Sequence, residues 1–130
     1  MLKSLASVVM VFAAMTVVEA QAGDMSRIGT SIQAGNAKEL SAYFDTNIEI
    51  AIYEDENVYS KAQAALVLKD FFNKHRPSSF KIIHNGSSKQ GSQFGIGTLV
   101  TAKGTFRTYI LIKQKDSKSY IQEIRFASDN

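Results

Sequence analysis

The sequence predicts an α+β domain in which helices pack on one face of a strongly curved antiparallel sheet. Between Gln93 and Phe126, three runs rich in β-branched and aromatic residues are separated by turn residues, which predicts a three-stranded antiparallel meander. In the first half of the chain, two helix-capping patterns precede stretches with helical periodicity. Helices segregated from a run of strands are typical of the α+β class.

Residues 1–22 have the pattern of a cleaved signal peptide. Lys3 supplies the positive start, residues 5–18 form the apolar segment, and Ala20 and Ala22 mark a small-residue cleavage site. The apolar run is shorter than the roughly 20 residues that span a bilayer, so we expect no stable membrane anchor. An uncleaved anchor or a buried N-terminal helix is the alternative. We predict an exported protein, periplasmic or secreted, with residues 23–130 as a single domain.

Two helices are expected next. Apolar residues recur at helical spacing over residues 25–32, and Gly35 follows as a C-terminal cap. Asn36–Glu39 form a capping box, in which each side chain satisfies a backbone amide of the other residue. The second helix is expected to turn Tyr43 and Phe44 inward.

A hairpin with an acidic turn follows these helices. Residues 48–53 alternate between isoleucine and other residues, as in a half-buried strand, and Val58–Tyr59 begin a short return strand. The turn between them, Glu54–Asn57, could be interpreted as a calcium or magnesium site. Such a site needs carboxylates spaced along a loop together with backbone ligands, so a solvated turn is the favoured interpretation.

The long helix of the domain begins at a second capping box, Ser60–Gln63. An apolar stripe continues to Phe72, and the helix is expected to end near Asn73 because Pro77 disfavours helical angles at the residue before it. Residues 80–84 then alternate as a strand, which makes the order helix, helix, strand, strand, helix and four strands.

The meander is predicted to have three-residue hairpin loops, with Thr101 opposite Thr105 and Lys115 opposite Ser119. Because successive side chains of a strand point to opposite faces, this register separates two sets. The expected inner face, under the helices, is nearly continuous and apolar: Phe94, Ile96, Thr98, Val100, Phe106, Thr108, Ile110, Ile112, Tyr120, Gln122, Ile124 and Phe126. The expected outer face is mixed: Gly95, Gly97, Leu99, Thr101, Arg107, Tyr109, Leu111, Lys113, Ile121, Glu123 and Arg125.

Composition excludes several classes of protein. Without cysteine there can be no disulfide framework. The formal net charge is +3, but the basic residues are scattered singly, so we expect no nucleic-acid binding. The chain has two histidines, His75 and His84, which do not lie in a ligand-spaced cluster, and we predict no metal site and no cofactor.

Several segments of the chain resemble an uncharacterised family of small exported bacterial proteins, typed as a domain of unknown function. The segments are Gly35–Leu40, Tyr59–Ala64, Phe80 with His84 and Gly86, Ile96–Leu99, and Gly104–Arg107. The resemblance implies the cone-shaped fold of nuclear transport factor 2 and ketosteroid isomerase, and it implies export. It supplies no catalytic residues to transfer.

Enzymes of this superfamily place a general base inside the cone, which makes the predicted inner face the place to search. His84 is its one group that titrates near neutral pH, and no carboxylate is expected there to orient it. The candidate lining of a small-ligand site is His84, Thr98, Thr108, Tyr120, Gln122, Tyr43 and Tyr59. An isomerase or lyase of ketosteroid isomerase type that uses His84 is the alternative function.

The outer face is the second candidate site, because arginine and tyrosine are enriched at protein interfaces and leucine and isoleucine would form an apolar centre. Cross-strand pairs on a solvated surface are the other interpretation. The candidate interface residues, which would pair two copies back to back, are Leu99, Arg107, Tyr109, Leu111, Ile121, Glu123 and Arg125. We therefore expect a non-catalytic binding or interaction module, with a small apolar ligand in the cone or a homodimer as its partner.

Overall fold

The computed structural model describes residues 24–129. The predicted signal peptide, residues 1–22, lies outside the described residues. A first helix covers residues 24–34 and is followed by α2 (Ala37–Ser41) and, later in the chain, α3 (Lys61–Lys74). The strands are β1 (Phe44–Ile52), β2 (Asp55–Ser60), β3 (Pro77–Ser87), β4 (Ser92–Thr101), β5 (Gly104–Lys115) and β6 (Lys118–Ser128).

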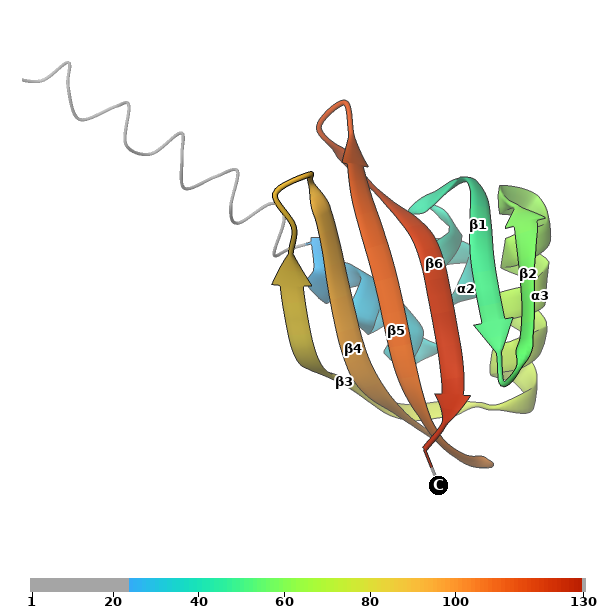
Figure 1. Cartoon of the computed structure of the whole chain (residues 1–130). Helices are drawn as coiled ribbons and strands as arrows, with labels where there is room; N and C mark the ends of the chain where they lie inside the picture. Colours follow the sequence, from blue (N-terminus) through green and yellow to red (C-terminus); the bar gives the residue numbers. More distant parts are fainter. Residues whose placement is uncertain (1–23, 130) are drawn as a thin grey trace, which may run out of the picture.

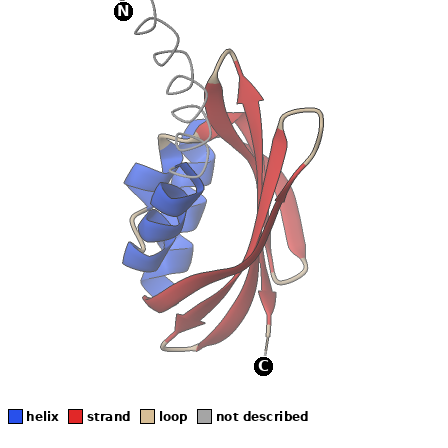
Figure 2. Ribbon diagram, turned by 90° about the vertical axis from the view of Figure 1, so that its left-hand side faces the viewer, coloured by secondary structure: helices blue, strands red, loops and turns tan. Residues whose placement is uncertain are grey.

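The strands form one six-stranded sheet in the order β2-β1-β6-β5-β4-β3 (Figure 1). Neighbouring strands are antiparallel except for β1 and β6, which run parallel. The sheet is curved, and the helices lie on one side of it (Figure 2). We call the side toward the helices the inner face and the opposite side the outer face. The predicted α+β class and order of elements are confirmed.

Local signals account for the ends of the helices. The Asn36 side chain accepts a hydrogen bond from the Glu39 amide at 3.0 Å, and Ser60 accepts from the Gln63 amide at 3.3 Å. Gly35 has a positive φ of 64° after the first helix, a conformation that favours glycine. The second helix is shorter than predicted, because Phe44 already belongs to β1, where it is buried.

All three hairpins with short turns reverse direction in two residues, not in three or four. Ile52 pairs with Asp55, Thr101 with Gly104, and Lys115 with Lys118. The predicted pairs of Thr101 with Thr105 and of Lys115 with Ser119 are therefore wrong. In the last turn Asp116 and Ser117 both have positive φ, as in the type I′ turn that is common in hairpins of this length.

With the observed register, each side chain of β4 lies on the opposite face of the sheet from the predicted one. Leu99 and Thr101 are buried on the inner face, together with Gly95 and Gly97, and the predicted inner residues of β4 lie outside. Gly97 is on the inner face because the ring of Phe80 occupies that space: a Cβ at Gly97 would lie 2.6 Å from ring atoms of Phe80. An aromatic ring on β3 thus replaces the side chain that β4 lacks.

β6 contains a bulge, and beyond it the pairing of β6 with β5 returns to the predicted register. Ile112 pairs with Ile121 and Leu111 with Glu123, so Gln122 is the extra residue. Beyond the bulge, the predicted pairs Tyr109–Arg125 and Leu111–Glu123 are confirmed. Between the bulge and the turn, Ile121 is buried and Tyr120 pairs with the exposed Lys113, the reverse of the predicted faces.

Aromatic side chains fill the space between α3 and the inner face. The ring of Phe71 stacks on Phe126 with centroids 4.3 Å apart, and meets Phe106 edge-on at 5.3 Å. Phe72 and Phe80 are buried in the same core. These rings occupy the cone interior in which a small ligand was predicted.

Candidate functional site

The outer face of the sheet is the candidate functional site, because no described element of residues 24–129 covers it (Figure 2). Reading across β4 and β5, the paired outer residues are Phe94 with Leu111, Ile96 with Tyr109, and Thr98 with Arg107. Phe94 is 36% exposed and Val100 37% exposed, although both are large apolar residues. The rings of Phe94 and Tyr109 stack across the two strands with centroids 6.5 Å apart. We call Phe94, Ile96, Val100, Tyr109 and Leu111 the apolar stripe.

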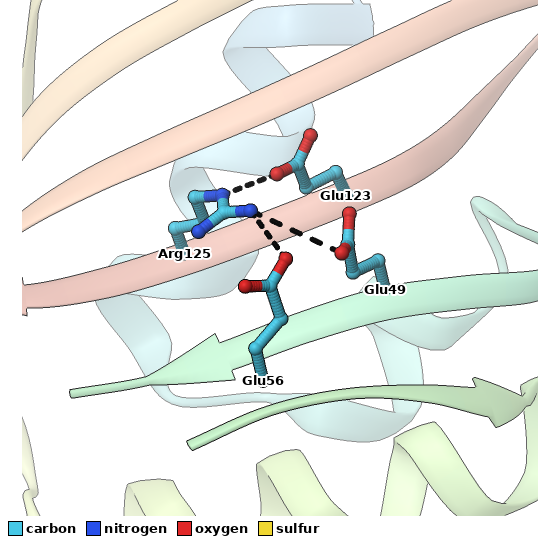
Figure 3. A network of polar contacts seen from close by, with 4 residues as sticks. All are labelled: Glu49, Glu56, Glu123 and Arg125. Carbon is cyan, nitrogen blue, oxygen red and sulfur yellow. Dashed lines mark hydrogen bonds and ion pairs between the residues drawn. The ribbon is translucent and has the colours of Figure 1, made fainter. Parts of the chain in front are cut away.

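Next to this stripe, Arg125 on β6 gathers three carboxylates (Figure 3). Its guanidinium group lies 2.5 Å from Glu56 on β2 and 3.9 Å from Glu49 on β1, and it donates a hydrogen bond to Glu123 on β6. Strand pairing brings these residues together, because Glu49 lies beside Glu123, and Ala51 lies beside both Glu56 and Arg125. We call these four residues the arginine–carboxylate cluster.

The charges of the cluster influence one another. A hydrogen bond with Glu56, partial burial and the nearby charge of Glu123 raise the pKa of Glu49 above its ordinary value. The same hydrogen bond and the guanidinium of Arg125 lower the pKa of Glu56. The hydrogen bond to Glu123 raises the pKa of Arg125. Of Glu49 and Glu56, Glu49 is therefore the carboxyl group that more readily holds a proton.

The three carboxylates of the cluster have the ligand type that hard cations prefer, and their nearest oxygen atoms lie within 4.8 Å of one another. Arg125, however, contributes a permanent positive charge among them. The guanidinium group neutralises the carboxylates in the way that a bound cation would. We interpret the cluster as a charged feature of the surface, not as a metal centre.

Most of the predicted interface residues do share the outer face. Arg107, Tyr109, Leu111, Glu123 and Arg125 lie on it in neighbouring strands. Leu99 and Ile121 were predicted there too, and that placement is wrong because both side chains are fully buried in the core. Leu99 was misplaced because the register of β4 differs from the predicted one, and Ile121 was misplaced because it precedes the bulge in β6.

The predicted lining of the cone is largely dispersed. His84, Thr98 and Tyr120 pair with outer residues and lie on the outer face, with His84 exposed, so their predicted inward placement is wrong. An isomerase or lyase mechanism that depends on His84 inside the cone thereby loses its base. Thr108 does lie inside, fully buried on β5.

The remaining candidates of that lining lie at the periphery of the core. Tyr43 and Tyr59 are half-buried and pack against it, Tyr59 from the inner face of β2. Gln122, at the bulge, donates a hydrogen bond to the Asp45 carboxylate at 3.2 Å. Asp45 also accepts from Lys115 at 2.8 Å, and this ion pair is the main cause of its lowered pKa.

Sequence reasoning missed the apolar part of the outer face. Phe94, Ile96 and Val100 were assigned to the core because they alternate and are apolar, but the opposite face of β4, with Gly95, Gly97 and Leu99, is the buried one. Gly95 and Gly97 were the signal in the sequence for the buried face of β4, since glycine in a strand often marks a close approach by another group. Glu49 lies on the outer face, but Glu56, which was assigned to the turn, lies in β2, and nothing in the spacing of the two residues linked them to Arg125.

Comparisons with known proteins support the family resemblance. The sequence model of a family described as a domain of unknown function (DUF4783) matches residues 25–127. The crystal structure of a DUF4783 family protein from Bacteroides ovatus is 29% identical, with a TM-score of 0.77, and the alignment covers 80% of this chain and 94% of that one. A comparison with curated proteins finds no significant match.

More distant structures share the fold alone. A cystatin-like domain of unknown function from Nostoc punctiforme is 8% identical with a TM-score of 0.68, covering 88% of this chain and 78% of that one. An NTF2-like protein of unknown function from Cytophaga hutchinsonii is 7% identical with a TM-score of 0.57, covering 81% and 86%. Among the described helices of this chain, none is long and apolar enough to cross a membrane.

Proposed function

Because the chain belongs to the DUF4783 family of domains of unknown function, we propose its function from the geometry of its own surface: it is a non-catalytic interaction module that pairs two copies through the outer face. The observation that carries this proposal is the apolar stripe on a face without a covering layer. Sheets normally bury their apolar residues, and an exposed patch rimmed by polar residues is typical of a protein–protein interface.

The distribution of charge supports a second copy as the partner. Acidic residues of the outer face lie on β1, β2 and β6, in the arginine–carboxylate cluster. Basic residues of the outer face lie on β5, where Arg107 and Lys113 flank the apolar stripe, and on the edge strand β3, which carries Lys81. The carboxylates thus lie on one half of the face, and the apolar stripe and the basic residues lie together on the other half. A surface of this kind is complementary to a reversed copy of itself.

The direction of the two-fold axis follows from this division. An axis that runs along the strands, between the two faces, reverses the order of the strands in the second copy. β2 and β1 of one copy then lie over β3 and β4 of the other, which brings acidic residues opposite Lys81. An axis across the strands would instead place the acidic clusters opposite each other. We propose the first arrangement, with the sheets crossed by about 30° because each is twisted.

A small apolar ligand inside the cone is a weaker alternative for this chain. Such a ligand would have to separate the stacked rings of Phe71 and Phe126 and their contacts with Phe106. Tightly packed aromatic cores resist the insertion of additional atoms. The outer face requires no such rearrangement, and we therefore assign the partner to it.

Sedimentation equilibrium of the full chain tests the proposal. The expected mass is twice that of the monomer at about 100 μM chain. Arg107→Glu should weaken the dimer about tenfold or more, because it places an acidic residue opposite the acidic side of the partner. Lys69→Glu on the exposed surface of α3 is the matched control, and it should leave the association unchanged.

Two results would contradict the proposal. A wild-type chain that stays monomeric at this concentration has no functional homodimer through the outer face. Equal weakening by Arg107→Glu and Lys69→Glu would mean that net charge, not the outer face, controls association.

A further inference from the structure

A groove between the β1–β2 hairpin and α3 lies on the other side of the sheet from the proposed dimer face. Its volume is about 610 Å³. Its apolar lining includes Ile50 and Ile52 of β1, Tyr59 of β2 and Val67 of α3. We propose that this β2–α3 groove binds small amphipathic cations, molecules with an aromatic or aliphatic body and one ammonium group.

The apolar part of the groove is already formed and open to solvent. Leu66 of α3 is 68% exposed and Tyr53 is 52% exposed, although both side chains have large apolar surfaces. Tyr53 is held in place, because its ring packs on Phe106 with centroids 5.4 Å apart. Its hydroxyl also lies 3.5 Å from a ring nitrogen of His75. A fixed aromatic wall beside an exposed leucine suits the flat or aliphatic body of a small molecule.

The polar part of the groove is acidic. Asp55 of β2 and Asp70 of α3 both line it. Asp70 forms an ion pair with Lys74 at 3.0 Å, whereas Asp55 accepts a hydrogen bond from the uncharged Asn57 and forms no ion pair among residues 24–129. Asp55 therefore offers an unneutralised carboxylate beside apolar and aromatic surface. An ammonium group satisfies that carboxylate, and the tyrosine rings add attraction through their π faces.

The size of the groove limits the occupant to a small molecule. Pockets for small ligands typically have volumes of about 300–1,000 Å³, and this groove falls within that range. An anionic ligand is disfavoured because both charged groups of the lining are carboxylates. A neutral ligand would contact the apolar lining without using Asp55.

The absence of tryptophan from the sequence makes the proposal simple to test. Indole fluorescence then comes only from the ligand, and its anisotropy reports binding to the full chain. Tryptamine, tryptophol and indole-3-acetate carry the same ring with an ammonium, a hydroxyl and a carboxylate group. We expect tryptamine to bind with a Kd below about 1 mM, tryptophol more weakly, and indole-3-acetate most weakly of the three.

Substitutions separate the contribution of charge from that of apolar contact. Asp55→Asn should weaken tryptamine about threefold to tenfold and leave tryptophol unchanged, because it removes the charge but keeps the shape. Glu54→Gln is the matched control, since this neighbouring acidic residue does not line the groove, and its effect should stay below about twofold. Leu66→Ala should weaken tryptamine and tryptophol alike, since it removes apolar surface only.

The proposal fails if the anisotropy of tryptamine does not rise when the protein is added up to about 1 mM. It also fails if Asp55→Asn and Glu54→Gln weaken tryptamine binding equally. It does not depend on the proposed dimer. Arg107→Glu, which lies on the outer face, should leave tryptamine binding unchanged even if it abolishes association.

Discussion

Two buried threonines on the inner face of the sheet differ in one respect, and this difference predicts opposite effects of the same substitution. Thr108 is fully buried on β5, and among the described residues its hydroxyl has no hydrogen-bond partner. Thr101, buried at the end of β4, donates to the Gly104 carbonyl at 2.7 Å and accepts from the Lys103 amide at 3.2 Å. We predict that Thr108→Val stabilises the protein and that Thr101→Val destabilises it.

The magnitudes follow from the state of each hydroxyl. A buried hydroxyl without a partner costs about 1–3 kcal/mol, and a valine methyl group of similar size removes that cost. We therefore expect Thr108→Val to raise the free energy of unfolding by about 1 kcal/mol, or the melting temperature by about 4 °C or more. Thr101→Val removes two hydrogen bonds at a partly hydrated turn, and a loss of about 1–2 kcal/mol is expected.

Urea unfolding followed by far-ultraviolet circular dichroism measures both effects. The m-value should be the same for the wild type and both variants, because the surface exposed on unfolding hardly changes. A Thr108→Val variant that is less stable than the wild type at an unchanged m-value would refute this prediction. That result would mean that the Thr108 hydroxyl is satisfied in solution, for example by a buried water molecule.

Two further predictions concern packing and charge. Gly97→Ala should destabilise the protein by about 1–3 kcal/mol in urea unfolding, since the new Cβ would lie 2.6 Å from the Phe80 ring and 2.8 Å from the Lys81 carbonyl. Gly29→Ala, in the first helix with ordinary contacts at 3.6 Å, should instead stabilise by up to about 1 kcal/mol, and equal losses would contradict the packing argument. Arg125→Met should cost about 1 kcal/mol at pH 7, because it leaves the three carboxylates of the cluster without their cation. In this variant the repulsion among the carboxylates raises their pKa values in the folded state above those in the unfolded state, so the folded state binds more protons. The loss of stability should therefore shrink as the pH falls through about 5 to 4. A loss of stability that is constant with pH would show that packing is responsible.

Local chemistry made the helices and the order of elements predictable. Asn36 and Ser60 cap their helices as their sequence patterns predict, and Gly35 adopts the backbone conformation that its position suggested. These features depend on residues within one turn of each other. The alternation of β5 was also assigned correctly, because only one of its faces carries charged residues, Arg107 and Lys113.

The faces of β4 were assigned wrongly because the deciding contacts are distant in the chain. Gly95 and Gly97 look like residues of an open face, but the side chains of Met25 and Phe80 fill the space above them. Gly104 likewise fits either a three-residue loop or the first position of a strand. A pattern within one strand does not contain this information, and the apolar stripe was hidden for the same reason.

The bulge at Gln122 limits prediction in β6, since one extra residue exchanges the faces within a single strand. The arginine–carboxylate cluster could not be predicted for a different reason. Its members come from β1, β2 and β6, and only the parallel pairing of β1 with β6 makes them neighbours.

That parallel pair also determines when the protein can fold. β6 is the last strand of the chain but the third strand of the sheet, and it is the link between the β1–β2 hairpin and the β3–β4–β5 meander. Until β6 is present, the sheet consists of two separate pieces with unpaired apolar edges at β1 and β5, the kind of edge that invites aggregation. The fold therefore completes only when β6 is added, and a nascent chain that lacks β6 has no continuous sheet on which to build a core.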